Sequence, residues 1–465
     1  MPDQSSLAMI PQEVLEHIVF FAATDDFLGP PSGILPFLAV NRTMHDALSF
    51  NTNPHLYARI FAHKYDLAPA IRRMGADLFP ATALAEELRR RSIVLKRIRH
   101  RLDSKRGTGE RQIRRCSDNS QGAGEEHIDT LLWTAYLMML ESDGRNERQL
   151  REYARVNEWL KEYWFHESGA SGALDIVKNA DEWPENTERM SLATWLFWYM
   201  LEPEEYMHDD NLFRDATGIL KVLALGAHKY PSCYPNWQDF VPKRSKLHPS
   251  LVRHFSSDIE VIAPAPASPA ILAYLTLVNK LSVSWETTNY MKPLFPAVDI
   301  DRSARKNTEW DCDWARIHSL ANPRILLGNT LSRSFTPGSL EGVWEGIFTY
   351  TEFTSYAALL SGAPPSVLQR SLVAQHRQTI KVREWHLLAP GIDEHEPTRN
   401  VTPLSPGNPS RAYVPDGVTI SEVTDGLEIT EPGRERVIYH SWSSTQKTNA
   451  LGRVKDIFLT GEVRF

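Results

Sequence analysis

The sequence has little of what defines several common protein classes. It contains only three cysteines, at positions 116, 233 and 312 of 465 residues. An odd number of widely spaced cysteines excludes the disulfide framework of a small secreted domain and favours a reducing compartment. No Lys or Arg precedes Arg42, so the basic start of a secretory signal is missing. The longest apolar runs reach about half of a membrane span. We therefore expect a soluble protein of the cytoplasm, the nucleus or both.

Motifs that hold metals, nucleotides or catalytic nucleophiles are also missing. There is no Cys-x-x-Cys, no His-Glu-x-x-His, no Gly-x-x-x-x-Gly-Lys-Ser/Thr loop and no Gly-x-Gly-x-x-Gly fingerprint. The sequence Gly338-Ser339-Leu340-Glu341-Gly342 places its serine one position away from that of the Gly-x-Ser-x-Gly nucleophile elbow. We therefore expect no catalytic residue, no metal site and no cofactor, and a chain that is not an enzyme.

The composition is that of a globular protein, with 42% hydrophobic and 23% charged residues. The length allows roughly three domains. The net charge of −7 does not favour nucleic acid as a partner. Positive charge is concentrated in residues 89–115, which hold twelve Lys or Arg and two Asp or Glu. This segment is either a localisation signal or acidic-partner patch, or a solvated helix face followed by a basic loop.

Helical spacing of apolar residues dominates the first two thirds of the chain. In residues 10–23, Leu15, Ile18, Val19 and Ala22 recur on one helical face. A second helix is expected from Phe37 to Leu48, and a short third helix over 55–65. Further helices are expected at 84–102, 128–141, 147–164, 189–201, 211–227 and 268–281, with a polar loop at 104–124.

The pattern changes to strand-like runs after about residue 325. Strands are expected at 342–350, 379–388, 417–421, 426–430, 436–442 and 456–464. Asp425-Gly426 favours a hairpin turn. A helical insertion is expected near 356–375, and a Pro-rich loop at 390–415. The sequence therefore predicts an α+β protein whose C-terminal part is a mostly antiparallel β barrel or sandwich.

The N-terminal segment resembles an F-box. Ile10-Pro11-Gln12-Glu13-Val14-Leu15-Glu16-His17-Ile18 is similar to that family's opening motif, Leu-Pro-x-Glu-Leu/Val-Leu-x-x-Ile. Phe37-Leu38-Ala39-Val40-Asn41-Arg42-Thr43-Met44 is similar to its second half, Leu-x-x-Val-Ser/Asn-Arg-x-Trp. The chain departs from the family in two ways: Met44 stands in place of the Trp, and residues 25–33 lengthen the turn. A Met side chain can fill an apolar site.

Other stretches resemble large F-box-like proteins of mushroom-forming fungi. They lie at 53–61, 339–346 and 383–388. Gly342-Val343-Trp344-Glu345-Gly346 is also similar, more weakly, to the entry of the substrate-binding β-barrel in some animal F-box proteins. The resemblance implies three parts: a three-helix F-box at 1–65, a helical spacer at 66–325 with a basic loop at 103–125, and a β-rich substrate-binding domain at 326–465. It also implies a β-domain that continues beyond Phe465, which would leave an exposed strand edge.

The function that the resemblance implies is that of a substrate receptor in a ubiquitin ligase. An F-box binds a Skp-type adaptor, which links to a cullin scaffold, and the receptor holds a protein substrate near the loaded ubiquitin. No membrane or nucleic acid is expected as a partner. The residues expected at the adaptor face are Ile10, Pro11, Leu15, Ile18, Val19, Leu38 and Val40. The residues expected to contact substrate are Trp344, Tyr350, Phe353, Arg383 and His386.

Each of these features also has a simpler interpretation. The apolar faces of residues 10–48 could be core of the helical region, Trp344 could be a core side chain, and Arg383 and His386 could be charges on a strand surface. The rival function is a ligand-binding or catalytic β-barrel protein whose N-terminal helices are only structural. A receptor would expose apolar side chains between residues 10 and 48. The rival would instead enclose a polar-lined cavity between residues 340 and 465.

Overall fold

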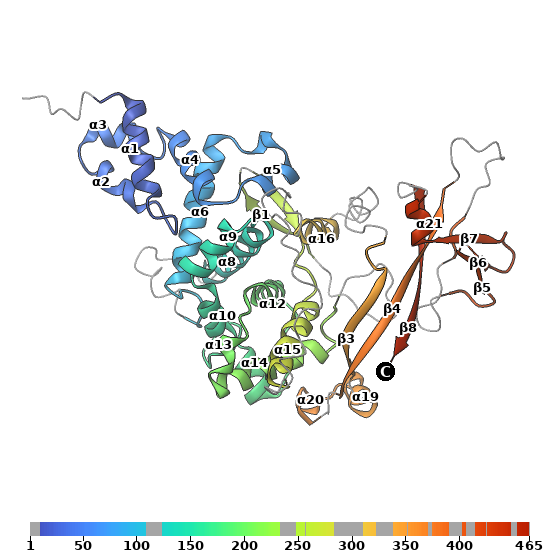
Figure 1. Ribbon diagram of the computed structural model, residues 1–465. Coiled ribbons are helices and arrows are strands. Elements are labelled where there is room, and N and C mark those ends of the chain that lie inside the picture. Colours follow the sequence, from blue (N-terminus) through green and yellow to red (C-terminus); the bar gives the residue numbers. More distant parts are fainter. Residues whose placement is uncertain are drawn as a thin grey trace, which may run out of the picture. The chain divides into compact units, whose positions relative to one another are not determined.

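The chain divides into two compact units. The computed structural model describes residues 10–107, 123–232, 248–255, 257–282, 310–321, 338–350, 352–370, 374–389, 402–405, 414–424, 426–447 and 453–464. The helical unit comprises Met1–Gly328 and Ala357–Arg370, and the β unit comprises Asn329–Tyr356 and Ser371–Phe465 (Figure 1). The segments 1–65 and 66–325, expected as separate domains, thus fall in one unit. The boundary expected at residue 326 lies close to Gly328, and the helical insertion belongs mostly to the helical unit.

The helical unit contains most of the helices in the described residues. Its first part consists of α1 (Gln12–Thr24), α2 (Leu35–Leu38), α3 (Arg42–Leu48), α4 (Pro54–Lys64), α5 (Ala68–Met74) and α6 (Ala81–Arg99). Its middle part consists of α8 (Ala123–Leu140), α9 (Arg145–Arg148), α10 (Val156–Phe165), α11 (Ala173–Asp175), α12 (Glu188–Met200), α13 (Glu204–Met207) and α14 (Asp210–Leu225). It ends with α15 (Ala267–Ser282), α16 (Asp311–Ala321) and α20 (Ser366–Arg370). In the described part of the chain, no helix combines the length and the apolar character that crossing a membrane requires.

The predicted second helix is two helices. α2 ends at Leu38, and α3 begins at Arg42. Between them, Asn41 adopts an extended backbone conformation, and its side chain accepts a hydrogen bond from the Met44 amide at 2.8 Å. This is an N-cap, which satisfies a backbone donor at the start of α3. The single helix expected from Phe37 to Leu48 was therefore wrong, because the capping residue was taken as part of its interior.

The helix predicted over 147–164 is also interrupted. A π-helical segment, Gln149–Tyr153, follows α9, and Arg155 then takes a left-handed conformation with φ of 55° before α10 begins. A hairpin that helical spacing did not predict, β1 (Ser250–His254) and β2 (Ser257–Val261), lies between α14 and α15. The other predicted helices are confirmed, with ends that differ by a few residues.

The core of the helical unit is one continuous apolar cluster that runs from Leu15 to Ile317. It also encloses a charged group. The side chain of Arg91 is fully buried and pairs at 2.7 Å with both Glu87 and Glu141. The Nε2 atom of buried His254 lies 2.6 Å from Glu141. The Arg91 guanidinium also lies over the ring of Phe61, one of three aromatic rings around it. The two carboxylates and the aromatic rings around Arg91 offset the free-energy cost of removing its charge from water.

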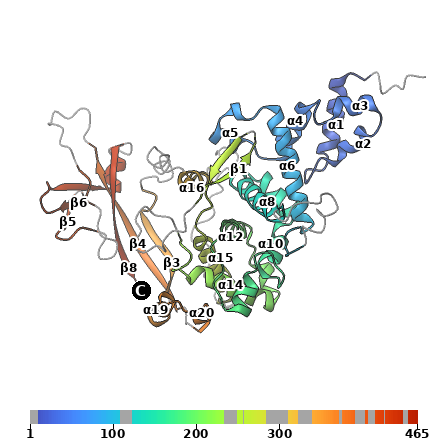
Figure 2. The same cartoon turned by 180° about the vertical axis from the view of Figure 1, so that it is seen from behind.

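The β unit is built on an antiparallel half-barrel sheet, so the predicted α+β class is confirmed. Its strands are β3 (Gly342–Tyr350), β4 (Ala374–Leu388), β5 (Thr419–Val423), β6 (Gly426–Thr430), β7 (Val437–Ser441) and β8 (Val454–Arg464). The order is β3-β4-β7-β6-β5, and β8 pairs with β4 (Figures 1 and 2). The hairpin predicted at Asp425-Gly426 joins β5 to β6. Helix α21 (Trp442–Lys447) precedes β8, and α19 (Phe353–Leu360), before β4, spans the boundary between the two units.

Strand β4 is the centre of the β unit, because both of its faces are covered near its C-terminal end. Trp385 and Leu387 belong to a small apolar core, together with Leu427, Ile429 and Tyr439. On the opposite face, Glu384 and His386 are also buried. The ring of His386 meets the ring of Trp442 edge to face, with centroids 5.6 Å apart. A strand buried on both faces holds its neighbours in a fixed register.

Candidate functional site

Helix α1 is apolar on two sides. One row is buried in the core and consists of Leu15, Val19 and Ala23. The other row consists of Val14, Ile18 and Phe21, whose side chains are 47%, 43% and 66% exposed. The buried row is sufficient to fix the helix on the unit. A second row of exposed apolar side chains is typical of a binding surface.

Two more exposed side chains follow this row in the sequence. Leu35 in α2 is 62% exposed, and Val40, just before α3, is 51% exposed. α1, α2 and α3 lie together in both views of the chain (Figures 1 and 2). We use the name N-terminal apolar face for the exposed apolar side chains of this three-helix segment, which are Val14, Ile18, Phe21, Leu35 and Val40. Met44, which stands in place of the family's Trp, is buried in the core instead.

The structure divides the residues that the sequence placed at the adaptor face. Pro11, Ile18 and Val40 are exposed. Ile10 and Leu38 are partly buried against the core. Leu15 and Val19 are buried, at 8% and 0% exposure, so these two were wrong as surface residues. Val14, Phe21 and Leu35 were missed. For Val14 and Phe21 on α1, the spacing of apolar residues does not say which side of the helix other helices cover.

The lengthened turn after α1 is anchored to the rest of the helical unit. The Nζ atom of Lys64 donates a hydrogen bond to the carbonyl oxygen of Asp26 at 2.5 Å. Gln149 holds the same turn from another side: its side chain accepts from the Gly29 amide at 2.7 Å and donates to the Phe27 carbonyl at 3.0 Å. The N-terminal helices are therefore fixed on the unit through backbone hydrogen bonds as well as through their apolar core.

The residues expected to contact substrate do not form one site. Trp344 is 48% exposed, and its Nε1 donates to the Leu340 carbonyl at 2.8 Å. Phe353 is 82% exposed, and Arg383 is partly exposed near Glu422 and Glu462. The side chain of Tyr350 lies outside the described residues. His386 is fully buried and cannot touch a partner, so its assignment to a binding surface was wrong.

His386 belongs to a structural clamp on the loop before β3. The carboxylate of Glu384 accepts hydrogen bonds from the amides of Gly338 at 2.6 Å and Leu340 at 2.5 Å. The Nε2 atom of His386 lies 3.1 Å from the same carboxylate. Burial opposes ionisation of Glu384, but these hydrogen bonds outweigh it and lower the pKa of its carboxyl group. The group therefore stays charged and holds the loop to β4.

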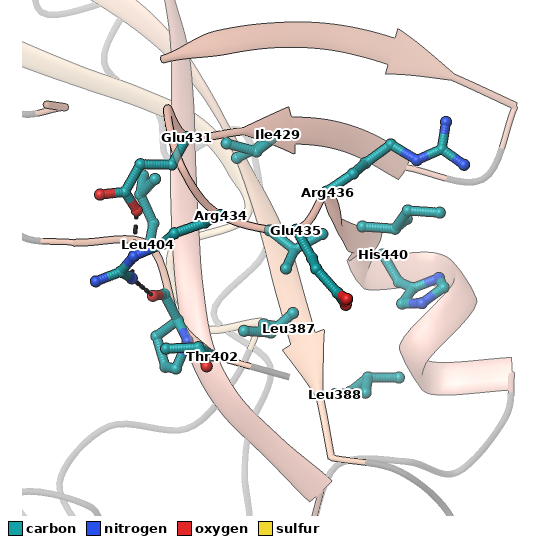
Figure 3. A pocket seen from close by; sticks show the side chains of 13 residues that line it. Leu387, Leu388, Thr402, Leu404, Ile429, Glu431, Arg434, Glu435, Arg436 and His440 are labelled. Carbon is teal, nitrogen blue, oxygen red and sulfur yellow. Dashed lines mark hydrogen bonds and ion pairs between the residues drawn. The ribbon is translucent and has the colours of Figure 1, made fainter. Parts of the chain in front are cut away.

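A cavity of about 530 Å³ lies elsewhere in the β unit (Figure 3). Its apolar lining includes Leu387, Leu404, Ile429 and Val437, and its charged lining consists of Glu431, Arg434, Glu435 and Arg436. These residues come from the end of β4, the segment 402–405, β6, the turn between β6 and β7, and β7 itself. Its volume is within the range of ligand-binding sites. The sequence did not indicate it, because these segments come together only in the folded sheet.

The basic segment is largely paired where the structure describes it. Its ion pairs join Arg90 to Glu87, Arg91 to Glu87 and Glu141, Arg97 to Asp103, Arg101 to Glu158 and Glu162, and Arg106 to Asp175. Arg91 connects α6 to Glu141 just after α8, and Arg101 connects the segment after α6 to α10, which favours the structural interpretation of residues 89–107. Residues 108–115, and with them the centre of the predicted basic loop, lie outside the described residues.

The described residues contain no group of three or more His, Cys, Asp or Glu that could hold a metal ion. No protein-family model, curated protein or solved structure matches this chain. The geometry therefore offers two candidate sites, the N-terminal apolar face and the cavity of the β unit.

Proposed function

We propose that this chain is a substrate receptor of a Skp/cullin-type ubiquitin ligase, and that its N-terminal apolar face docks the adaptor. One observation supports this most: Val14, Ile18 and Phe21 form an exposed apolar row on α1, while the opposite row already anchors the helix. The resemblance of residues 10–44 to an F-box motif supports the same function.

The size of the face bears on how the adaptor would bind. Complete burial of a Val, Leu, Ile or Phe side chain is worth about 1.5–3 kcal/mol, and these five side chains are roughly half exposed. Covering them would contribute on the order of 5 kcal/mol. A micromolar complex needs about 8 kcal/mol after the costs of association. The face would therefore act as the anchor of a larger interface that also includes polar contacts.

The anchoring of the turn suits this function. A receptor performs no bond chemistry itself and acts by holding a substrate near the loaded ubiquitin. Its adaptor-binding part must therefore not move freely relative to the rest of the chain. The hydrogen bonds from Lys64 and Gln149 to the turn after α1 tie the N-terminal helices to the helical unit.

The test is co-expression of the full chain with a Skp-type adaptor, followed by size-exclusion chromatography. We expect a 1:1 complex with the wild-type chain and none with Ile18→Asp. Ile93→Asp is the matched control, because Ile93 is an equally exposed isoleucine on α6 of the same unit, at 52% against 43% for Ile18. Ile93→Asp should bind as the wild type does. A complex that survives Ile18→Asp would contradict the proposed docking surface.

A second candidate is a ligand-binding β-unit protein whose N-terminal helices are only structural. The cavity in Figure 3 is the observation that favours it. Burial of Leu15, Val19 and Met44 is also compatible with a purely structural role. The two candidates predict different results in the co-expression experiment above. A wild-type chain that elutes as a soluble monomer and forms no complex with the adaptor supports the second candidate.

A further inference from the structure

We infer that the cavity of the β unit binds an extended, unphosphorylated peptide segment that inserts an aliphatic or aromatic side chain. The inference concerns residues that the sequence did not indicate, namely the end of β4, the segment 402–405 and the hairpin of β6 and β7. That this peptide belongs to a ubiquitination substrate rests on the receptor function proposed above. The binding itself does not.

The first argument is an opening in the sheet. β4 and β7 pair only at Trp385 with Ser441 and at His386 with His440. Beyond these pairs, β4 continues to Leu388 beside β8, while β7 runs back to Val437 beside β6. Among the described residues, the facing edges of the two strands have no strand between them. An extended peptide satisfies such edges through its own backbone, as in the addition of a strand to a sheet.

The second argument is that the walls of the opening are held in place. Segment 402–405 forms one wall and is tied to the β6–β7 hairpin at three points. The Leu404 amide donates to the hydroxyl of Tyr439 at 3.2 Å, and the Ser405 amide donates to Glu431 at 3.2 Å. Arg434 donates to the Pro403 carbonyl at 3.1 Å (Figure 3). A site with fixed walls loses little conformational freedom when a ligand binds.

The turn that carries two of these contacts is itself well determined by the sequence. Residues 431–434 read Glu-Pro-Gly-Arg, and the Arg434 amide donates to the Glu431 carbonyl at 3.0 Å. Gly433 has φ of 80°, which a type II turn requires at this position after a proline. The turn therefore presents Glu431 and Arg434 side by side at the wall.

The third argument concerns what the cavity would accept. The accessible apolar part of its lining comes from Leu388, Leu404 and Val437, which are partly exposed and suit an apolar side chain. The charged lining is balanced, with two glutamates and two arginines. Both arginines are already engaged, Arg434 with Glu431 at 3.3 Å and Arg436 with Glu428 at 3.1 Å. A phosphate group would have to displace one of these partners, so an unphosphorylated segment fits better.

The experiment selects random twelve-residue peptides, displayed on phage and therefore unphosphorylated, on the immobilised full chain. Enriched peptides are then synthesised, and their dissociation constants are measured by fluorescence anisotropy. We expect enriched sequences that share an aliphatic or aromatic position. Ile438→Trp, on a lining residue that is 39% exposed, should weaken binding at least tenfold by filling the opening. Ile420→Trp is the matched control: this isoleucine lies on β5, is 43% exposed and does not line the cavity, so binding should change less than twofold.

No enrichment over the bare matrix would overturn the inference, and so would enriched peptides that bind Ile438→Trp as tightly as the wild type. If Ile438→Trp fails to fold, Thr402→Phe narrows the cavity from the segment 402–405, where Thr402 is exposed, and must give the same loss. Adaptor binding is measured on the same samples. A chain that binds peptides but no adaptor would support this inference and contradict the receptor function. A chain that binds the adaptor but no peptides would support the receptor function and contradict this inference.

Discussion

Lys64 donates a hydrogen bond from its buried ammonium group to the backbone carbonyl oxygen of Asp26, with 2.5 Å between the two atoms. This contact joins the end of α4 to the turn that follows α1, so a single side chain helps to fix the orientation of the N-terminal helices. Burial disfavours the charged amine, and the charge of Asp26 only partly opposes this effect. The pKa of Lys64 is consequently lowered to about 8.

The lowered pKa predicts a specific dependence of stability on pH. The unfolded chain keeps its lysine proton up to about pH 10.5, whereas the folded chain releases it near pH 8. Between these values the unfolded state binds more protons, so stability rises with pH. Between pH 7.5 and pH 9.5, the free energy of unfolding of the helical unit should increase by about 2 kcal/mol from this group. Urea unfolding at both pH values measures it, and Lys64→Met should lack the increase. An equal increase in both proteins would contradict the lowered pKa.

A second prediction concerns Gly29 in the same turn. Its φ is 73°, and a Cβ atom there would lie 2.3 Å from the ring of Tyr153. Gly29→Ala should therefore lower the free energy of unfolding of the helical unit by about 1–3 kcal/mol. Gly218→Ala is the control, because Gly218 lies inside α14 with no atom near the added methyl group. It should instead stabilise the helix by about 0.5–1 kcal/mol. Thermal unfolding distinguishes the two, and a harmless Gly29→Ala would argue against this turn conformation.

A third prediction concerns the buried arginine. Burial opposes ionisation of Glu87, but the charges of Arg90 and Arg91 outweigh it and hold the pKa of that carboxyl group well below its ordinary value. Arg91→Met would leave Glu87 and Glu141 charged in the core with fewer partners. The expected loss of stability is about 3–5 kcal/mol, measured by chemical unfolding. Lys96→Met, at an exposed position on the same helix, should cost less than about 0.5 kcal/mol. Similar losses in both variants would show that the buried network contributes little.

A fourth prediction concerns the clamp on the loop before β3. Glu384→Ala would leave the amides of Gly338 and Leu340 without their acceptor, at a cost of about 1–3 kcal/mol for each group that stays buried. We expect faster hydrogen exchange at these two amides and a change in the fluorescence of Trp344, which donates to the Leu340 carbonyl. Glu345→Ala, an exposed position on β3, should change neither signal. Unchanged exchange in Glu384→Ala would mean that other contacts hold the loop.

Local patterns in the sequence determined most of the elements. The limits predicted for the strands at 342–350 and 426–430 agree with β3 and β6. Strand-like runs of residues that are bounded by Gly, Asp or Asn depend on neighbouring residues alone. Local patterns failed where packing against distant residues decides the backbone. The β1–β2 hairpin carries His254 and Phe255, and these are buried against Glu141 and Phe61 of the helical unit. Spacing within the segment 250–261 contains no information about that surface.

The sequence by itself determined that α1 is a helix, and its spacing put Leu15, Ile18 and Val19 together on one apolar face. Only the tertiary structure decided that Leu15 and Val19 face the core and that Ile18 and Phe21 face outward, because packing partners on other helices cover just one of the two rows. The same holds for the cavity. The pattern of each strand can be recognised in the sequence. The opening exists because β4 and β7 separate after two residue pairs, β4 remaining beside β8 and β7 beside β6, and such pairing between distant segments is set only in the folded sheet.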